Sequence, residues 1–567
     1  MSHAATFNVR DIPFSTFGSW LDISPVIAQN AYADDLHLVS HQGGMHPVLC
    51  FAPLGPATRA GVVVQATPSL LSWRYPQGHA EATYESPDTI RVRGAGVELQ
   101  ITAAASRLTP FSGSYFHRDP VDGAYVFTTY ETGRRYRVSI LSGTVRSLGD
   151  QALGEAERGL VLGGGTWEVA IEEYESARAP YAAAGTFEET AAATAAAFTR
   201  FADAVAPWRS ERTPAAELAC YVLWSATVRP AGFLARPAVL MSKHWMDKVW
   251  SWDHCFNALA LAAGEPDLAW DQYKLIFDHQ DPMGGLPDSV THSEVLYNFV
   301  KPPIHGWALR KLRAIVDLSP EQLKETYDQL ARWTAFWMDT RRGDREALPH
   351  YQHGNDSGWD NATPFDTERV AQTADLPAFL VLQMRELAEL AALLGEHETA
   401  EDWTKNAGRL RDDLLGQLWT TDRFATRSPR SGATWTSASL LDLMPIVLGA
   451  ELPGEITSAL AGRIAGHLTA HGLATERPDS PRYQSDGYWR GPVWAPATVL
   501  IEDGLRRAGH STLADDISAR FRTLCETSGF AENFDALTGA GLRDRAYTWT
   551  ASGYLLLAAA HERRCSR

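Results

Sequence analysis

The chain is poor in cysteine, and its cysteines form no pattern typical of a disulfide framework or a zinc site. Only five occur in 567 residues, and none lies in a CxxC pair or at metal-ligand spacing from a histidine. They are Cys50, Cys220, Cys255, Cys525 and Cys565. Scattered single cysteines are typical of a reducing compartment, so we expect a cytoplasmic protein and assign no metal.

Long apolar runs and excess positive charge are also missing. Residues 1–20 contain no basic segment followed by an apolar one, and no stretch of about 18 apolar residues occurs, so the sequence predicts neither a secretion signal nor a membrane span. The formal net charge of −17 argues against nucleic acid or an anionic membrane as a partner. The patterns GxxxxGK[ST], HExxH and GxSxG are absent, and we expect no cofactor.

Tryptophan, by contrast, is abundant. The chain has 19, and many lie next to Asp, Arg or Gly rather than within apolar runs. Core packing accounts for some of them. Trp beside polar groups also suits a flat, hydroxylated ligand, which offers one apolar face and a rim of hydrogen-bonding groups. We therefore expect a small carbohydrate as the partner.

Residues 1–185 are predicted to form short β-strands. Tyr136, Val138 and Ile140 alternate with polar neighbours, a period typical of strands with one buried face. Further candidate strands are 46–54, 61–73, 89–102, 124–130 and 167–171. Many short strands without intervening helices indicate an antiparallel β-sandwich. The glycines at 163–165 are interpreted as a turn rather than a phosphate cradle, because a strand follows them.

A helical period replaces the strand period after about residue 186. An Ala-rich segment predicts a helical linker over 186–210, and an all-α domain is expected over 211–567. Trp403, Leu410 and Leu414 share one helical stripe, and the sequence from Ser319 to Gln322 is typical of a capped helix start. About twelve helical segments, one of them interrupted by Pro445, indicate a helical toroid.

Two carboxylates, Asp356 and Asp360, lie four positions apart in the segment 354–361. The density of Gly, Ser and Asn there predicts a tight turn. Trp359 places apolar surface beside Asp360, and burial against such a surface favours the protonated form of a carboxyl group. A protonated acid next to an aromatic ring suits glycoside cleavage, which needs a proton donor and a face for sugar stacking. The alternative is a surface turn whose Asp and Asn cap a helix.

Other polar, aromatic-rich segments also fall between predicted helices, at 250–253, 281–287, 488–494 and 532–539. If alternate connections meet at one end of the toroid, these segments converge there, because binding and catalytic groups commonly sit on loops held by a rigid scaffold.

Three of these segments together resemble glycoside hydrolase family 63. The motifs are SGWDN at 357–361, YWRGPVW at 488–494 and ENFDALTG at 532–539. That family includes processing α-glucosidases and bacterial mannosylglycerate and glucosylglycerate hydrolases. The resemblance extends by scattered motifs over residues 240–555, and with the strand-rich N-terminal part we expect a β-sandwich followed by an (α/α)6 barrel.

The resemblance implies that Asp360 is the general acid and Glu532 the general base of an inverting hydrolase. In such an enzyme one carboxylic acid protonates the leaving oxygen, and one carboxylate activates water on the opposite sugar face, about 6.5–9.5 Å away. The alternative for Glu532 is a loop-end or helix-capping carboxylate.

The remaining motif residues are expected to bind the terminal sugar. Trp252 and Asp253 match a family Trp-Asp pair whose Asp accepts hydroxyl hydrogen bonds, although Asp253 suits a helix N-cap equally well. Trp489 and Trp494 resemble aromatic walls of the sugar pocket, with core packing as the alternative. The expected substrate-binding residues are Trp252, Asp253, Lys301, Asp356, Trp359, Tyr488, Trp489, Arg490 and Trp494.

Two positions depart from the family pattern and bear on the substrate. Asp356 stands where many relatives have Glu, and we expect it either to orient Arg490 or to act on Asp360 as a like charge. Lys301-Pro302-Pro303 replaces Gln-Pro-Pro. We expect Lys301 either to bind a substrate carboxylate, as in a glyceryl glycoside, or to lie in solvent.

The leading prediction is therefore an inverting, exo-acting α-glycosidase, with an α-glucosidase as the first expectation. Two alternatives stay open. An inverting glycoside phosphorylase uses phosphate in place of activated water and needs no base at Glu532, and a non-catalytic carbohydrate-binding protein keeps the pocket without turnover.

Overall fold

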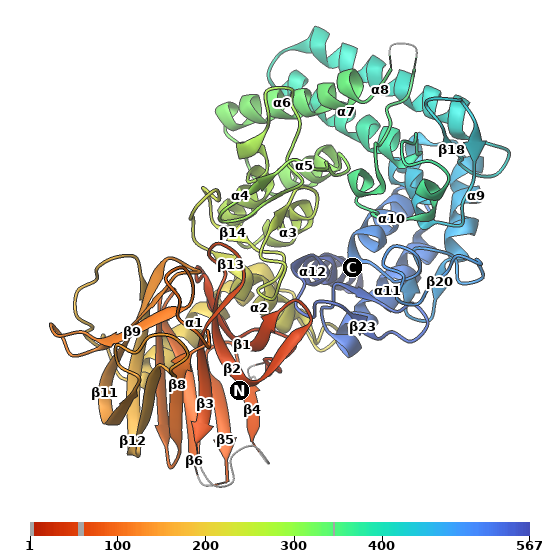
Figure 1. The fold of residues 1–567 in the computed structure, drawn as a ribbon. Coiled ribbons are helices and arrows are strands. Elements are labelled where there is room, and N and C mark those ends of the chain that lie inside the picture. The colour runs from red at the N-terminus through yellow and green to blue at the C-terminus, as the bar shows by residue number, and fades with distance from the viewer. Residues whose placement is uncertain (1–4, 55–61, 77, 344–345, 567) are drawn as a thin grey trace. The chain divides into compact units, whose positions relative to one another are not determined.

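A computed structural model describes residues 5–54, 62–76, 78–343 and 346–566 (Figure 1). The chain forms two compact units, and it passes between them more than once. The first consists of Met1–Asp203, Cys220–Lys248 and Thr291–Ser293, and the second of Ala204–Ala219, Val249–Val290 and Glu294–Arg567. These units are a different division of the chain from the predicted domains, whose boundaries at 185 and 210 stay a prediction.

The first unit is built from twelve antiparallel strands that share one hydrogen-bonded network. The strands are β1 (Leu21–Ala28), β2 (Ala31–Ser40), β3 (His46–Leu54), β4 (Val63–Ala66), β5 (Leu71–Tyr75), β6 (Gly78–Ser86), β7 (Thr89–Ala95), β8 (Glu98–Ala103), β9 (Ser114–Arg118), β10 (Tyr125–Thr129), β11 (Arg134–Leu148) and β12 (Gly159–Tyr174). Their order is β1-β2-β3-β8-β12-β7-β6-β5-β4, and β11, β10 and β9 continue from the other edge of β12.

Strand β12 joins the two layers of this sandwich-like unit. Along one edge, residues 159–162 pair with β8, whereas residues 166–172 pair with β7. Between these stretches lie Gly164 and Gly165, with φ values of 92° and 87° that favour glycine. The prediction of a turn at 163–165 is therefore wrong, because the glycines form a corner inside one long strand.

Most strand predictions are confirmed, and the errors have one cause. The predicted strands 46–54 and 124–130 correspond to β3 and β10. The predicted single strand 89–102 is wrong, because a bend at Gly96, with a φ of 67°, separates β7 from β8. The prediction 61–73 likewise covers two strands, β4 and β5, and its first residue lies outside the described residues. The alternation of apolar and polar residues continues across a tight bend, so it does not reveal where one strand ends and the next begins.

The segment Cys220–Lys248 belongs to the first unit through buried polar contacts. The ring of His41 lies between Asp22, at 2.7 Å, and Asp247, at 3.5 Å. Burial alone would lower the pKa of His41, but the two carboxylates outweigh it and raise that pKa to about 9. A charged imidazole thus ties this later segment to the first strands.

Helices dominate the second unit. The α-helices of the chain are α1 (Phe187–Val205), α2 (Ala216–Ala226), α3 (His254–Leu261), α4 (Pro266–Lys274), α5 (His305–Arg313), α6 (Pro320–Ala335), α7 (Asp375–Leu393), α8 (His397–Leu418), α9 (Gly454–Ala465), α10 (Ala495–Arg507), α11 (Ser511–Ser528) and α12 (Thr548–Cys565). Shorter helical segments are the 3₁₀ helices η1 (Phe277–His279), η3 (Gly354–Ser357), η4 (Thr363–Asp366) and η5 (Leu440–Glu451) and the π-helix η2 (Phe336–Thr340).

Six helical segments of the second unit form a closed ring. Among the described residues, each packs against the next in the order α3, α5, α7, η5, α10 and α12, and α12 packs against α3. An outer layer surrounds this ring: α4 packs on α3, α6 and α8 on α7, α9 on η5, and α11 on α10. Figure 1 shows α7 and α8 side by side in green to teal. Two concentric layers of paired helices are the architecture of an (α/α)6 barrel.

Local sequence patterns determine the start of α6 and the irregularity of η5, as predicted. The Ser319 hydroxyl accepts the N–H of Gln322 at 3.2 Å, and the Gln322 side chain accepts the N–H of Ser319 at 2.8 Å, so the capping box at the start of α6 is confirmed. Pro445 lies inside η5, which is 3₁₀ rather than α-helical. No helix among the described residues combines the length and apolar character needed to cross a bilayer.

Short paired strands lie in the connections of the barrel and beside it. They are β13 (Thr227–Val228), β14 (Ala238–Val239), β15 (Val249–Trp250), β16 (Ser289–Val290), β17 (Val295–Leu296), β18 (Thr426–Arg427), β19 (Thr434–Trp435), β20 (Leu468–Thr469), β21 (Gly472–Leu473), β22 (Asn533–Phe534) and β23 (Gly541–Leu542). Several of them flank the predicted site residues, whose loops are therefore hydrogen-bonded to one another.

Candidate active site

The segment that carries Asp360 is a tight turn packed into the protein interior. Helix η3 ends at Gly358, whose φ of 71° lies in the left-handed region. A Cβ atom on Gly358 would lie 2.7 Å from the Trp252 ring, and one on Gly354 would lie 2.3 Å from the carbonyl oxygen of Asp360. Trp359 is buried, whereas 27% of the Asp360 side chain remains exposed. The tight turn is confirmed, and the alternative of a surface turn is wrong.

Asn361 and Arg490 join this turn to the YWRGPVW segment. The Asn361 side chain donates to the Gly487 carbonyl at 3.0 Å and accepts the N–H of Trp489 at 3.0 Å. The Arg490 guanidinium donates to the Asn361 carbonyl at 2.7 Å and forms an ion pair with Asp366. The expectation that Asp356 orients Arg490 is therefore wrong, because Asp366 is the carboxylate that does so.

Asp356 instead organises the backbone below the turn. Its carboxylate accepts the N–H of Val300 at 3.2 Å and that of Gln352 at 2.9 Å, and it pairs with Arg341 at 3.0 Å. Because Asp356 is buried and fully engaged with these three partners, it fixes the loop that contains Lys301 relative to the turn that contains Asp360.

Lys301 lies among carboxylates rather than in solvent. Only 6% of it is exposed, so the solvated alternative is wrong. Its ammonium donates to the Asn355 carbonyl at 2.9 Å and lies 3.3 Å from Asp288 Oδ1 and 3.6 Å from Asp360 Oδ1. Burial opposes the charged form, but the carboxylates outweigh it and raise the pKa of Lys301 above its usual value. The binding of a substrate carboxylate by Lys301 stays a prediction.

Asp253 occupies the N-cap position of α3 without capping the helix. Its side chain makes no capping hydrogen bond, and only 4% of the residue is exposed. Burial, together with the charges of Asp288 and Asp360, raises the pKa of Asp253 well above its usual value, although Lys301 opposes this shift. The raised pKa favours the protonated form of Asp253, which can donate one hydrogen bond and accept others.

Glu532 lies in a segment held by backbone hydrogen bonds. Its N–H donates to the Asp544 carbonyl at 2.7 Å, and β22 follows it directly. It is not at a helix end, so the helix-capping alternative is wrong. Glu532 is 2% exposed, and burial first, then the charge of Asp544, raises its pKa to about 8. The Arg543 charge opposes this shift and the Asp360 charge adds to it.

The ENFDALTG and YWRGPVW segments are joined through backbone atoms. The N–H of Val493 donates to the Phe534 carbonyl at 2.7 Å, and the N–H of Phe534 donates back at 3.1 Å. Together with Asn361 and Arg490, this bridge links all three motifs of the sequence into one group. Burial first, and then the charges of Asp360 and Glu532, raise the pKa of Tyr488 well above its usual value.

A cluster of indole rings packs beneath these groups. Trp489 and Trp494 stack with ring centroids 4.1 Å apart and an interplanar angle of 5°. Trp359 meets Trp489 at 4.6 Å, and Trp252 meets Trp549 edge-on at 5.7 Å. Trp489 and Trp494 are each 1% exposed, so they pack in the core as well as bordering the site residues. The indole cluster therefore supports the loops that carry the site residues.

Two residues of this site have a strained backbone. Tyr488 and Arg543 have φ values of 63° and 60°, which non-glycine residues seldom adopt. The Arg543 guanidinium lies 4.9 Å from the centre of the Tyr488 ring and donates to the Asn533 side chain at 2.9 Å. Side chains held in this way by strained backbone are typical of functional sites.

Three residues of this site were not predicted from the sequence. Asp288 lies one position beyond the segment 281–287 that the sequence singles out, and only its ion pair with Lys301 reveals its place. Arg543 and Tyr547 follow the ENFDALTG motif in a charged, aromatic run just before α12, and burial and then the charges of Glu532 and Asp253 raise the pKa of Tyr547 well above its usual value. That run of Arg, Asp, Tyr and Trp between two elements is a signal that could have found them.

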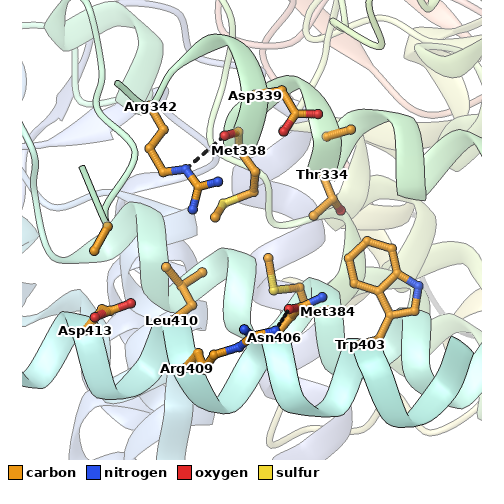
Figure 2. Close-up of a pocket in the computed structure, with 12 residues that line it drawn as sticks. Thr334, Met338, Asp339, Arg342, Met384, Trp403, Asn406, Arg409, Leu410 and Asp413 are labelled. Atoms are coloured by element: carbon orange, nitrogen blue, oxygen red, sulfur yellow. Dashed lines mark hydrogen bonds between the residues drawn. The ribbon is translucent and has the colours of Figure 1, made fainter. Parts of the chain in front are cut away.

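A separate cavity of about 490 Å³ lies in the outer helical layer, between the end of α6 and α8 (Figure 2). It is lined by Thr334, Ala335, Met338, Asp339, Arg342, Ala347, Met384, Trp403, Asn406, Arg409, Leu410 and Asp413. It contains none of the predicted site residues. Figure 2 shows Arg342 and Asp339 on one wall and Trp403 and Arg409 on the other.

The geometry agrees with comparisons to known proteins. Residues 246–550 match the family described as "Mannosylglycerate hydrolase MGH1-like glycoside hydrolase domain". This match covers more than half of the chain and includes every predicted site residue. The chain belongs to this family, within glycoside hydrolase family 63. It is therefore a glycoside hydrolase by family.

Individual relatives of this family 63 member support the same assignment. A mannosylglycerate hydrolase of Rubrobacter radiotolerans is 23% identical over 398 residues, which cover 53% of this chain and 89% of the relative. A solved GH63 mannosylglycerate hydrolase from Thermus thermophilus, in complex with glucose, is 22% identical at a TM-score of 0.54, covering 60% of this chain and 99% of that one.

A third protein shares the fold of the family 63 member along nearly all of its length. A bacterial glucoamylase complexed with acarbose gives a TM-score of 0.63 at 11% identity, covering 99% of this chain and 95% of that one. The antiparallel β-sandwich-like part and the (α/α)6 barrel are therefore both confirmed, because this likeness includes the N-terminal strands.

Proposed function

We propose that the chain is an inverting, exo-acting α-glycosidase that hydrolyses a terminal α-linked hexose from a small glycoside. The proposal depends on two carboxyl groups in contrasting surroundings: Asp360, partly exposed on a polar turn, and Glu532, buried in a segment that backbone hydrogen bonds join to the YWRGPVW segment. Asp360 protonates the glycosidic oxygen as the bond to the anomeric carbon breaks. Glu532 removes a proton from the water that attacks this carbon from the opposite face.

Neighbouring groups supply orientation. The raised pKa of Asp253 favours its protonated form, which donates a hydrogen bond to one sugar hydroxyl and accepts one from another, whereas a carboxylate only accepts. Trp252 and Trp359 fix the positions of the loops from which Asp253 and Asp360 extend. Holding the reacting groups in fixed positions lowers the entropy cost that two free reactants would meet when they come together in solution.

We expect a glucoside first and a mannoside second as the substrate, with a short, polar leaving group of the glyceryl type. The matched relatives carry the name mannosylglycerate hydrolase, and the sequence motifs resemble a family with both gluco- and mannosylglycerate hydrolases. A small leaving group is consistent with a site whose loops are tightly tied to one another.

The test is hydrolysis of a substrate panel by the purified full chain. The panel contains α-glucosyl- and α-mannosylglycerate, α-linked glucose disaccharides and β-linked controls, each with and without inorganic phosphate. We expect release of the β-anomer from α-glycosides, followed by ¹H NMR before mutarotation. Release of the α-anomer refutes inversion, strict dependence on phosphate favours the phosphorylase, and binding without turnover favours the carbohydrate-binding protein.

A further inference from the structure

The cavity between the end of α6 and α8 combines an aromatic face with charged groups of both signs (Figure 2). Its volume of about 490 Å³ lies within the range of small-molecule sites, which is roughly 300–1,000 Å³. Asp339 and Arg342 lie on one wall, and Trp403 and Arg409 lie on the other. The cavity therefore has the size and the mixed lining of a ligand site, although none of the predicted active-site residues contributes to it.

Trp403 supplies the aromatic face of this cavity. Its indole N–H donates to the Tyr327 hydroxyl at 3.0 Å, so the ring is held by one edge. Trp489 and Trp494 stack on each other and are each 1% exposed, whereas Trp403 is half-buried and borders the cavity. An indole that is held in this way suits stacking against the apolar face of a sugar ring.

Four charged side chains line the cavity, and none of them forms an ion pair with another of the residues that the structure describes. They are Asp339, Arg342, Arg409 and Asp413. Arg342 donates from Nε to the Met338 carbonyl at 3.0 Å, and Arg409 donates to the Asn406 side chain at 2.6 Å. Each guanidinium has five N–H donors, so both keep donors for a further partner.

This lining matches a neutral, polyhydroxylated ligand better than an ion. Two guanidinium groups and two carboxylates cancel in formal charge, so the cavity has little net attraction for either sign of ion. The guanidinium groups only donate hydrogen bonds and the carboxylates only accept them, whereas a sugar hydroxyl does both. A saccharide can therefore satisfy both kinds of group while one face of its ring lies against Trp403.

We propose that this cavity is an accessory binding site for a neutral mono- or disaccharide. The π-helix η2 gives independent support, because it contributes Met338 and Asp339 to the lining and because π-helical turns occur frequently at functional sites. The site binds a saccharide without cleaving it, and it does not depend on the proposed function of Asp360 and Glu532.

Fluorine NMR of protein labelled with fluorotryptophan reports on this cavity without turnover. The Trp403 signal is assigned by its loss in Trp403→Phe, and a Glu532→Gln background prevents cleavage of the probes. Glucose, maltose and trehalose are the neutral probes, and glucuronate and glycerate are the anionic ones. We expect the neutral saccharides to shift the Trp403 signal until the shift saturates, and the anionic probes to shift it less.

Two cavity variants and one matched control locate the binding. Arg409→Ala removes a donor from the exposed side of α8, and Asp413→Asn replaces an acceptor in the same helix. Each is expected to raise the Kd obtained from the Trp403 signal about tenfold, since hydrogen bonds to charged groups are stronger than neutral ones. Arg411→Ala removes an arginine of α8 that does not line the cavity, and it should leave this Kd unchanged.

Three results overturn the proposal. One is a Trp403 signal that no neutral saccharide shifts. Another is a Kd that stays the same in Arg409→Ala and Asp413→Asn, which indicates that the signal responds to binding elsewhere. The third is tighter binding of the anionic probes than of the neutral ones, which indicates an anion site.

Discussion

The two sides of the candidate site give the same chemical group opposite surroundings. Asp360 extends from a turn of glycine, serine and asparagine, keeps 27% of its side chain exposed and has an ammonium group 3.6 Å away. Glu532 lies in a segment held by backbone bridges, is 2% exposed, and has no cation within ion-pair distance among the described residues. Asp360 is therefore partly exposed beside a cation, and Glu532 is buried.

The comparison shows that two carboxyl groups can differ in chemical behaviour because of their positions in the fold, rather than because of their residue types. Burial disfavours the charged form of Glu532 and raises its pKa to about 8, whereas the Asp360 carboxyl group is partly exposed and lies 3.6 Å from the Lys301 ammonium. Enzymes that use two carboxylates depend on such unequal environments. Each prediction below alters one side and leaves the other in place, from the largest expected effect to the smallest.

Removal of either acid group is expected to cause the largest loss. Asp360→Asn and Glu532→Gln keep the side-chain shape but cannot transfer the proton, so kcat should fall about 10²–10⁴-fold. Initial rates on the best substrate of the panel, with circular dichroism to verify folding, measure this. The control is Asp503→Asn in α10, which breaks a partly buried pair with Lys311 of α5 and should leave kcat nearly unchanged.

The pH dependence is expected to report Glu532 on its acidic limb. Glu532 acts as a base only when ionised, and its pKa is raised to about 8, so kcat/KM should rise about tenfold per pH unit below that value. Asp544→Asn removes a charge that raises this pKa and should move the acidic limb to lower pH. A limb near the ordinary glutamate value, unchanged by Asp544→Asn, contradicts the environment described for Glu532.

The Asp360 turn is expected to tolerate no side chain at Gly358. Alanine there combines a φ of 71° with a contact of 2.7 Å to the Trp252 ring, so Gly358→Ala should lower the free energy of unfolding by about 2 kcal/mol. Urea denaturation measures the loss. Gly408→Ala, at a helical position with nothing within 4 Å of the added Cβ, is the matched control and should be neutral or stabilising.

The link between the two motif loops is expected to give the smallest effect. Asn361→Ala removes two hydrogen bonds, to Gly487 and Trp489, while Arg490 still holds the Asn361 carbonyl. We expect a fall in kcat/KM of about threefold to tenfold, since each net hydrogen bond contributes about 1 kcal/mol. A loss as large as that of Asp360→Asn would mean that Asn361 itself takes part in the chemistry.

Local sequence signals predicted the architecture well. Alternation located β3 and β10, and Ser319 with Gln322 located the start of α6, because both depend on neighbouring residues alone. The closed helical ring follows from helix number and short connections. The corner at 163–165 was not predictable, since a glycine run looks the same in sequence whether the strand ends or changes partners.

The candidate site was only partly predictable, for a similar reason. The motifs identified Asp360 and Glu532, whose roles stay a proposal. They did not reveal Asp288 or the partner of Arg490, because ion pairs between loops depend on the folded geometry and not on spacing in the sequence. The surroundings of Lys301 likewise depended on which carboxylates three separate connections brought to it.

The shared strand β12 has a consequence for the order in which the first unit can assemble during synthesis. Before residue 174 has left the ribosome, β8 and β7 each lack the neighbour that β12 provides, so a nascent chain exposes two unpaired strand edges. Both edges close together when β12 arrives, and until then the half-made sheets are open to pairing with other chains. We expect the N-terminal third to depend on chaperones, or on slow translation past this strand, more than the helical part does.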